Sequence, residues 1–369
     1  ANDEGGGGAG GRIALYYNSA THSGAVTAFG GSEATDGEAG GAGSVYIKNK
    51  ATTYTTLTYD NNGVVTELDP AKISFSSFAD TSQIIDHIYF SNAASVNWGD
   101  DQGSIIVKDV TIDLTSSISA FNSGYQPIRT AGATGNGYCA TCGGNATAAG
   151  TWRSATGGAH AGNGGQGTYA PEGYGQGGYG SAIEPITMGS AAGSYTTGEN
   201  CGGGAGAGAM KIFVTQVLTN NGSIKAEGQK GQCGGNAADG GGAGGSIWID
   251  AGTVAGAGSI SVIGGQGGYS NFRGGGGGGG RIAIYYDSLT YSGTYLFYGG
   301  LGNNHGGPGT LFVKSSGNAS GDLTYNNETR ATHARSNFYP TSLGTMKIGN
   351  FNVESNTNLL WTQSEVQTV

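Results

Sequence analysis

The stretch GGGGGGGRIAIYY, from Gly274 to Tyr286, decides how this chain folds, and GGGGAGGRIALYY, from Gly5 to Tyr17, repeats it almost letter for letter. In each stretch a glycine run leads into alternating aliphatic and aromatic residues, which is typical of a β-strand with one buried face. Because this order occurs near both ends of the 369-residue chain, it indicates an internal repeat.

The match continues well beyond these stretches. It pairs 40–48 with 306–314, Leu57–Tyr59 with Leu323–Tyr325, and Ile85–Trp98 with Ile348–Trp361. We therefore predict four parts: a first copy of the module at 1–104, one β rung with a Gly-, Tyr- and Cys-rich excursion at 105–205, central β rungs at 206–273, and a second copy of the module at 274–369.

A shorter repeat lies inside the long one. Apolar triplets begin at Ile212, Ile247 and Ile282, 35 residues apart, and each is followed by a second alternating pair. Such a unit buries its apolar face only when the next unit stacks on it, about 4.8 Å away. The pattern predicts an all-β fold, a glycine-rich parallel β-solenoid or β-helix-like stack with long glycine-rich loops. A set of β-sandwich modules is the alternative.

Glycine supplies 77 residues and proline only 6, without the Gly-X-Y period of collagen. Charged residues make up 11%, too few for a charge-extended disordered chain. Each glycine costs about 0.5–1 kcal/mol more backbone entropy than alanine, so dense backbone hydrogen bonding must offset it. We expect runs such as Gly274–Gly280 to pack as extended, polyproline-II-like threads, with flexible linkers as the alternative.

The four cysteines predict disulfides in an oxidising compartment, with a metal site at the CxxC of Cys139 and Cys142 as the alternative. Cys201 and Cys233 precede successive rungs by similar distances, so we expect them to stack and to form a bridge. Cys139 and Cys142 would then pair locally or in a cross-link.

No motif in the sequence specifies a reaction, so we predict neither an enzyme nor a bound cofactor or metal ion. The histidines share no ligand spacing, and we expect surface or satisfied loop positions for them. The net charge is −9 with scattered basic residues, which argues against nucleic acid, and no apolar run is long enough to span a membrane. Glycosylation sequons begin at Asn145, Asn221, Asn318 and Asn327.

The phrases GGGGGGGRIAIYY, GGPGTLFVK, GDLTYNN and GGAGGSIWIDAGTVAGAGSISVIGGQGG resemble the glycine-rich repeat regions of very large secreted bacterial surface proteins. The resemblance covers most of the chain. It implies an extracellular, adhesive or fibre-like role with β-helical character, and it brings no catalytic residues with it.

We expect a structural subunit of an extracellular filament or surface matrix, because a rung-like surface without a polar cap is expected at each end of the sequence. Its partner would be a second copy of the chain, bound head to tail. The candidate contact residues are Ile13, Leu15, Tyr17, Leu359, Leu360 and Trp361. The alternative is a carbohydrate-binding adhesin or a phage-tail-type receptor-binding module.

Overall fold

The described residues of the computed structural model are all-β, without a helix. They are 6–32, 38–65, 71–72, 85–99, 104–129, 133–144, 154–170, 175–195, 202–232, 238–269, 272–330, 336–338, 347–357 and 359–361. The predicted Cys201–Cys233 bridge and the sequon at Asn145 lie outside these residues.

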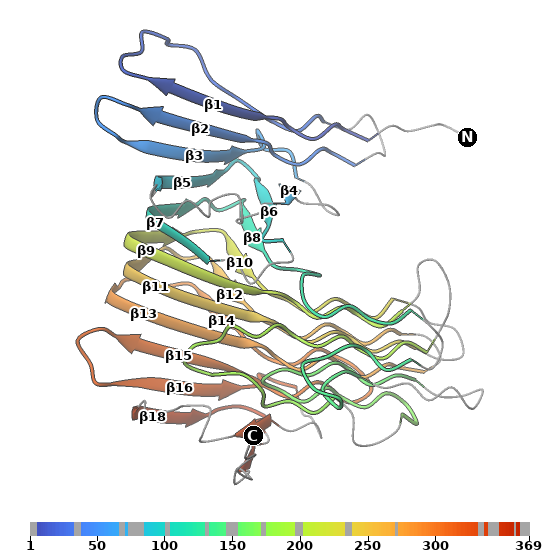
Figure 1. The fold of residues 1–369 in the computed structure, drawn as a ribbon. Helices are drawn as coiled ribbons and strands as arrows, with labels where there is room; N and C mark the ends of the chain where they lie inside the picture. Colours follow the sequence, from blue (N-terminus) through green and yellow to red (C-terminus); the bar gives the residue numbers. More distant parts are fainter. Residues whose placement is uncertain are drawn as a thin grey trace, which may run out of the picture.

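One sheet of eleven strands runs the length of the molecule, with β1 and β18 at its two ends (Figure 1). In spatial order its strands are β1 (Arg12–Tyr17), β2 (Ser44–Asn49), β3 (Thr55–Asp60), β5 (Ile85–Ser91), β7 (Ser104–Ile112), β9 (Ala209–Asn220), β11 (Ser246–Ala255), β13 (Arg281–Leu289), β15 (Gly309–Ser315), β16 (Ser320–Asn326) and β18 (Lys347–Val353).

A second sheet of six short strands faces the first. Its order is β14 (Thr294–Leu296), β12 (Ser259–Ser261), β10 (Ser223–Lys225), β8 (Ser117–Ser119), β6 (Ser95–Asn97) and β4 (Ala71–Lys72). A strand of the long sheet and the short strand that follows it form one rung, and all pairs in the second sheet are parallel. Two further strands, β17 (Ser336–Phe338) and β19 (Leu359–Trp361), pair with each other and form a separate two-stranded sheet.

Each rung ends close to where the next one starts. The N–H of Gly245, just before β11, donates to the carbonyl of Ala226, just after β10 (2.9 Å), and the N–H of Gly208 donates to the carbonyl of Ala120 in the same way (2.9 Å). Aliphatic side chains of successive rungs stack between the two sheets and form one core, which includes Val96, Ile118, Ile224 and Ile260.

The observed strand register agrees with the predicted 35-residue spacing for one pair of rungs and differs from it for the other. Ile247 pairs with Ile282 as expected, but Ile212 pairs with Ile249 and not with Ile247. A bulge in β9 opposite Ala251 and Thr253 adds a residue to that rung. The slip is two residues, so the side chains stay on their predicted faces.

The two matching stretches of sequence share one pairing scheme. β1, β2, β3 and β5 pair parallel, antiparallel and parallel in turn. β13, β15, β16 and β18 pair in the same order and sense. The equivalent residues also occupy equivalent places, since Leu57 lies opposite Tyr46 and Ile88, and Leu323 lies opposite Phe312 and Phe351.

Beside the strands, the glycine-rich segments form an ordered bundle of extended threads, which we call the glycine layer (lower right of Figure 1). Every N–H of thread Gly274–Gly280 donates to the main chain of another thread, and the accepting thread recurs every third residue. In order along the thread, the acceptors are the carbonyls of Gly268, Ala155, Asn304, Gly265, Gly158, Gly307 and Val262.

A three-residue period is that of a polyproline-II helix, which turns once in three residues and exposes its backbone groups on all sides. The thread therefore bonds to neighbours on three sides, and no side is left for a side chain. A Cβ added to Gly277 would lie 1.9 Å from the carbonyl oxygen of Gly242. The predicted packing of the glycine runs is confirmed for these residues.

We predict that Gly277→Ala destabilises the fold by about 3 kcal/mol or more, because backbone atoms in a packed bundle cannot move away from the new methyl group. Chemical denaturation followed by circular dichroism measures this. Gly317→Ala is the control, because the nearest atom to a Cβ there is the Ser315 hydroxyl oxygen at 3.9 Å. Equal stability of the two variants would contradict the close packing.

Candidate assembly interface

Strand β1 presents core-type side chains at the end of the stack. Ile13 and Leu15 are equivalent to Ile282 and Ile284 in the repeat, which are both completely buried between neighbouring rungs. In β1, by contrast, Leu15 is 38% exposed and Ile13 is partly exposed. The third candidate, Tyr17, is also partly exposed. The difference arises because no described strand pairs with the outer edge of β1.

The opposite end of the long sheet is the outer edge of β18, which likewise has no described strand beside it. The predicted contact residues Leu359, Leu360 and Trp361 belong instead to β19, which pairs with β17. The side chain of Leu359 is partly buried against the cluster around Phe312 and Leu323. The side chains of Leu360 and Trp361 lie outside the described residues. The edge that sequence reasoning missed is β18 itself.

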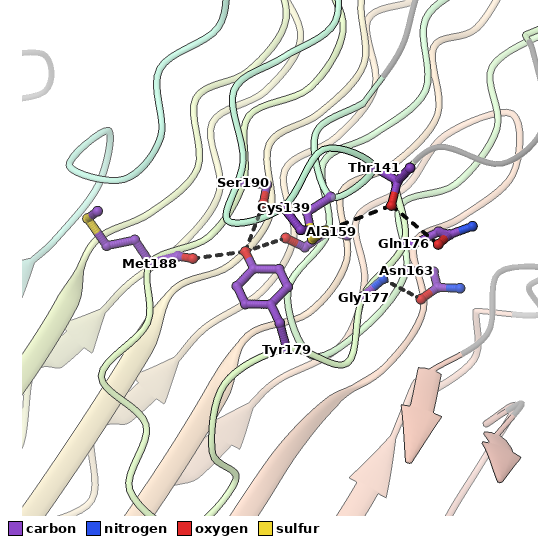
Figure 2. Close-up of a disulfide and its surroundings, with 10 residues drawn as sticks. Cys139, Thr141, Ala159, Asn163, Gln176, Gly177, Tyr179, Met188 and Ser190 are labelled. Atoms are coloured by element: carbon purple, nitrogen blue, oxygen red, sulfur yellow. Dashed lines mark hydrogen bonds between the residues drawn. A yellow bond between two sulfur atoms is a disulfide. The ribbon is translucent and has the colours of Figure 1, made fainter. Parts of the chain in front are cut away.

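The excursion after β8 packs against the rungs and adds threads to the glycine layer. Cys139 and Cys142 are joined by a disulfide at its start. Tyr138 stacks on Tyr179. The hydroxyl of Tyr179 lies 2.8 Å from the carbonyl oxygen of Ala159 and 2.8 Å from the hydroxyl of Ser190 (Figure 2). The pairing of Cys139 with Cys142 is the local one of the two arrangements expected from the sequence.

The excursion also covers the second copy of the module. Arg281 is buried, and its Nε and Nη2 donate to the carbonyl of Tyr179 at 3.1 and 2.9 Å. The equivalent residue in the first copy, Arg12, is exposed. The start of the module is therefore covered by the excursion in the second copy and exposed in the first.

An asparagine closes the glycine layer on the far side of each module. Asn61 accepts from the N–H of Gly30 (3.0 Å) and donates to the carbonyl of Gly40 (3.2 Å). Asn327 accepts from Gly299 (2.9 Å) and donates to Gly306 (3.2 Å) in the same way. The amide thus replaces the next thread. A comparison of the two copies by sequence would have found this pair.

The sequons differ in accessibility. Asn221 and Asn318 are exposed. Asn327 is completely buried and its amide donates two hydrogen bonds, so this sequon is not accessible in the folded chain.

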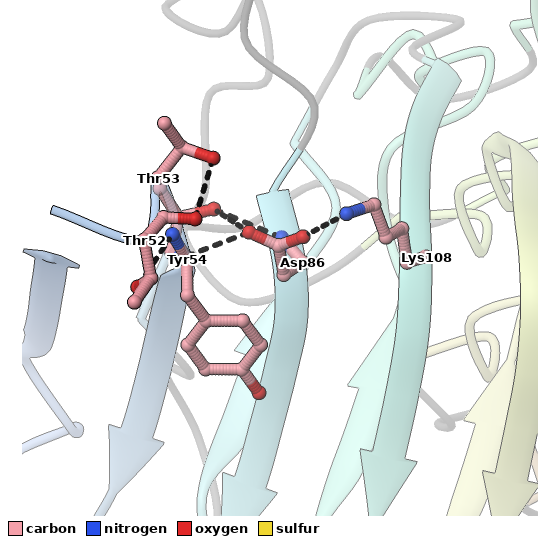
Figure 3. A network of polar contacts seen from close by, with 6 residues as sticks. Thr52, Thr53, Tyr54, Asp86 and Lys108 are labelled. Carbon is pink, nitrogen blue, oxygen red and sulfur yellow. Dashed lines mark hydrogen bonds and ion pairs between the residues drawn. The ribbon is translucent and has the colours of Figure 1, made fainter. Parts of the chain in front are cut away.

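A polar network joins the first module to the rung that follows it, across β3, β5 and β7 (Figure 3). The carboxylate of Asp86 accepts from the N–H of Thr55 at 2.7 Å and from its hydroxyl at 3.0 Å, and it forms an ion pair with Lys108. Desolvation raises the pKa of Asp86, but the hydrogen bonds and charge of these partners outweigh it and hold the pKa below its ordinary value. We assign the network a structural role, because it connects the neighbouring strands β3, β5 and β7.

His160 is a satisfied buried histidine, as expected for the loop histidines. Its Nδ1 donates to the carbonyl of Gly244 (2.9 Å), so its Nε2 accepts from the hydroxyl of Thr187 (2.8 Å). Burial, together with the charge of Arg281, lowers the pKa of His160 to about 3. The unfolded chain therefore binds a proton here below about pH 6.5 that the folded chain does not bind, and stability falls as the pH falls through this window.

We predict that the stability advantage of the wild type over His160→Gln shrinks by up to about 1.4 kcal/mol per pH unit between pH 6 and pH 4. Urea denaturation at a series of pH values measures it. His22→Gln, at an exposed position, is the control. A gap between wild type and His160→Gln that does not change with pH would contradict a neutral, buried imidazole.

Two observations on the described residues concern metal ions and small molecules. They contain no group of three or more histidine, cysteine or acidic residues placed to hold a metal ion. A hollow between Val26–Phe29 and strands β2 and β3 has a volume of about 50 Å³, against about 300–1,000 Å³ for a typical ligand pocket. None of the described segments is a helix of the length and apolar character needed to cross a membrane.

No protein-family model matches the sequence, and neither a curated protein nor a solved structure shows significant similarity to it.

Proposed function

We propose that the chain is a structural subunit of an extracellular filament or surface matrix that assembles end to end through open β rungs. The observation that carries the proposal is the exposure of Leu15 at a position where its repeat equivalent, Ile284, is completely buried. A row of core-type side chains that no further rung covers favours association, because burial of apolar surface stabilises a contact by about 25 cal/mol per Å².

The pairing of the strands supports the same proposal. We interpret the two facing ladders, with each rung closing onto the next, as a β-solenoid. A solenoid grows by adding rungs, and its terminal rungs need caps to remain soluble as a monomer. The edges of β1 and β18 lie at opposite ends of the long sheet, so a contact between them is heterologous and continues into a fibre unless rotation closes it.

An extracellular location fits the chemistry of the chain. The Cys139–Cys142 disulfide is stable in an oxidising compartment. The structure relies on backbone hydrogen bonds and has few charged groups, as expected of a material protein whose contacts are built from main chain.

We predict that Leu15→Glu prevents filament growth, because it places a charge in the core row that the next subunit must cover. Negative-stain microscopy and light scattering at increasing protein concentration measure growth. The matched control is Ile106→Glu, since Ile106 is an exposed aliphatic side chain on β7, away from both ends. A wild type that stays monomeric, or equal growth of both variants, would contradict the proposal.

A second candidate function is glycan binding at the tip of the glycine layer. Tyr169 and Tyr269 are 70% and 68% exposed, and the guanidinium of Arg273 lies 4.5 Å from the ring centre of Tyr269. Phe272 lies beside Tyr169, with ring centres 6.2 Å apart. Exposed aromatic faces next to a hydrogen-bond donor suit the apolar faces of sugar rings.

We predict that, if this second function holds, Tyr169→Ala combined with Tyr269→Ala abolishes retention on a glycan array without affecting filament growth. Tyr54→Ala, at an exposed tyrosine of the first module, is the control. A monodisperse monomer that binds glycans through this cluster would favour the adhesin over the filament.

A further inference from the structure

The second copy of the module shows what covers a face that is open in the first copy. Thread Gly274–Gly280 and strand β13 are covered on one side by the preceding rung. The N–H groups of Gly241 and Gly244 donate to the carbonyls of Gly275 and Gly278, both at 3.0 Å, and β11 pairs in parallel with β13. Thread therefore lies on thread, and strand lies on strand.

In the first copy, thread Gly6–Gly11 and β1 have no such cover. Gly8 and Gly11 are equivalent to Gly277 and Gly280, where an added Cβ would lie 1.9 and 2.1 Å from carbonyl oxygens of the preceding rung. At Gly8 and at Gly11 no described atom lies within 4 Å of such a Cβ, and both residues are exposed.

The contacts of this thread with the thread that follows it are the same in the two copies. The N–H groups of Gly7 and Gly10 donate to the carbonyls of Glu38 (2.7 Å) and Gly41 (2.9 Å). Their equivalents, Gly276 and Gly279, donate to the carbonyls of Asn304 (3.1 Å) and Gly307 (2.9 Å). The fold therefore builds the thread in its bonding geometry, and the two sides that face the preceding rung and the second row of threads in the second copy have no described neighbour in the first copy.

Ala9 shows which side of the thread can accept a neighbour. Its equivalent is Gly278, where a Cβ would lie 2.0 Å from the carbonyl oxygen of Gly162 in the second row of threads. Ala9 carries that Cβ, so the first copy does not accept a thread there at the same distance. The side formed by Gly8 and Gly11, in line with the edge of β1, remains suitable for close backbone approach.

We propose that thread Gly6–Gly11 is a docking surface for a second copy of this chain, bound by main-chain hydrogen bonds and continuous with the β1 edge. The inference rests on the proposed end-to-end assembly and adds a second contact to it. The occupant is identified by the repeat itself, because the only cover that the described residues show on the equivalent surface is another rung of this chain.

The contact must also be parallel. Along residues 6–17 a thread is followed by a strand. A two-fold contact would set the thread of one copy against the strand of the other, and their hydrogen-bond periods of three and two residues do not match. A parallel contact sets thread on thread and strand on strand, as where β11 lies on β13. Such a contact is heterologous, so it propagates.

The test is the double substitution Gly8→Val with Gly11→Val in the full chain. No described atom lies within 4 Å of a Cβ at either position, so we expect the melting temperature of the monomer to stay unchanged. The concentration needed for filament growth should rise at least tenfold, because the backbone of the partner can no longer approach the thread. Gly317→Val is the matched control, an open glycine in the turn between β15 and β16.

The outcomes separate this inference from the proposed function. Filaments that grow equally well from the wild type and from the double variant would overturn the thread contact and leave the strand contact in place. A wild type that forms no filament would overturn both. Discrete dimers that no longer form in the double variant would overturn the parallel arrangement. Loss of growth in the double variant alone, with normal growth of Gly317→Val, is the expected result.

Discussion

Backbone hydrogen bonding between glycine threads is the constraint on which the rest of this structure depends. Each N–H of Gly274–Gly280 reaches a carbonyl of a neighbouring thread, and the acceptor changes with a three-residue period, so every side of the thread carries bonds. A side chain on any side would separate two backbones. The entropy that glycine loses on folding is offset by one hydrogen bond per residue in a buried thread, where an unmade bond would be costly.

The β ladders and the glycine layer are two parts of the same repeat, and each sets the spacing of the other. The ladder stacks rungs at the strand distance, and the threads that enter and leave each rung are brought together at backbone contact. At the far side of each module, Asn61 or Asn327 supplies a donor and an acceptor in place of the next thread. The layer is thus closed by an amide on one side, while in the first copy the other side is open at Gly8 and Gly11.

Side-chain electrostatics have a secondary role in this chain. Buried polar groups such as His160 and Arg281 bond mainly to backbone carbonyls, and the Asp86–Lys108 pair joins neighbouring strands at one seam. Specificity therefore comes from the shape and hydrogen-bond pattern of the main chain. A protein built in this way is suited to add further copies of its own rungs, because the surface that each rung presents is the surface that the next one needs.

The sequence by itself determined the all-β class, the internal repeat, the inward-facing aliphatic rows and the ordered packing of the glycine runs. The alternation of apolar residues and the position of the glycine runs within the repeat are properties of the local sequence, and stacking does not change them. Only the tertiary structure decided the two-residue slip of Ile212, which depends on a bulge in β9. It also decided the capping role of Asn327, which read as a sequon, and the difference between Gly8 and Gly277, which occupy the same position of the repeat. These features depend on which rung lies next to which, and residues that meet in the stack lie far apart in the chain, as Ile212 and Ile249 do.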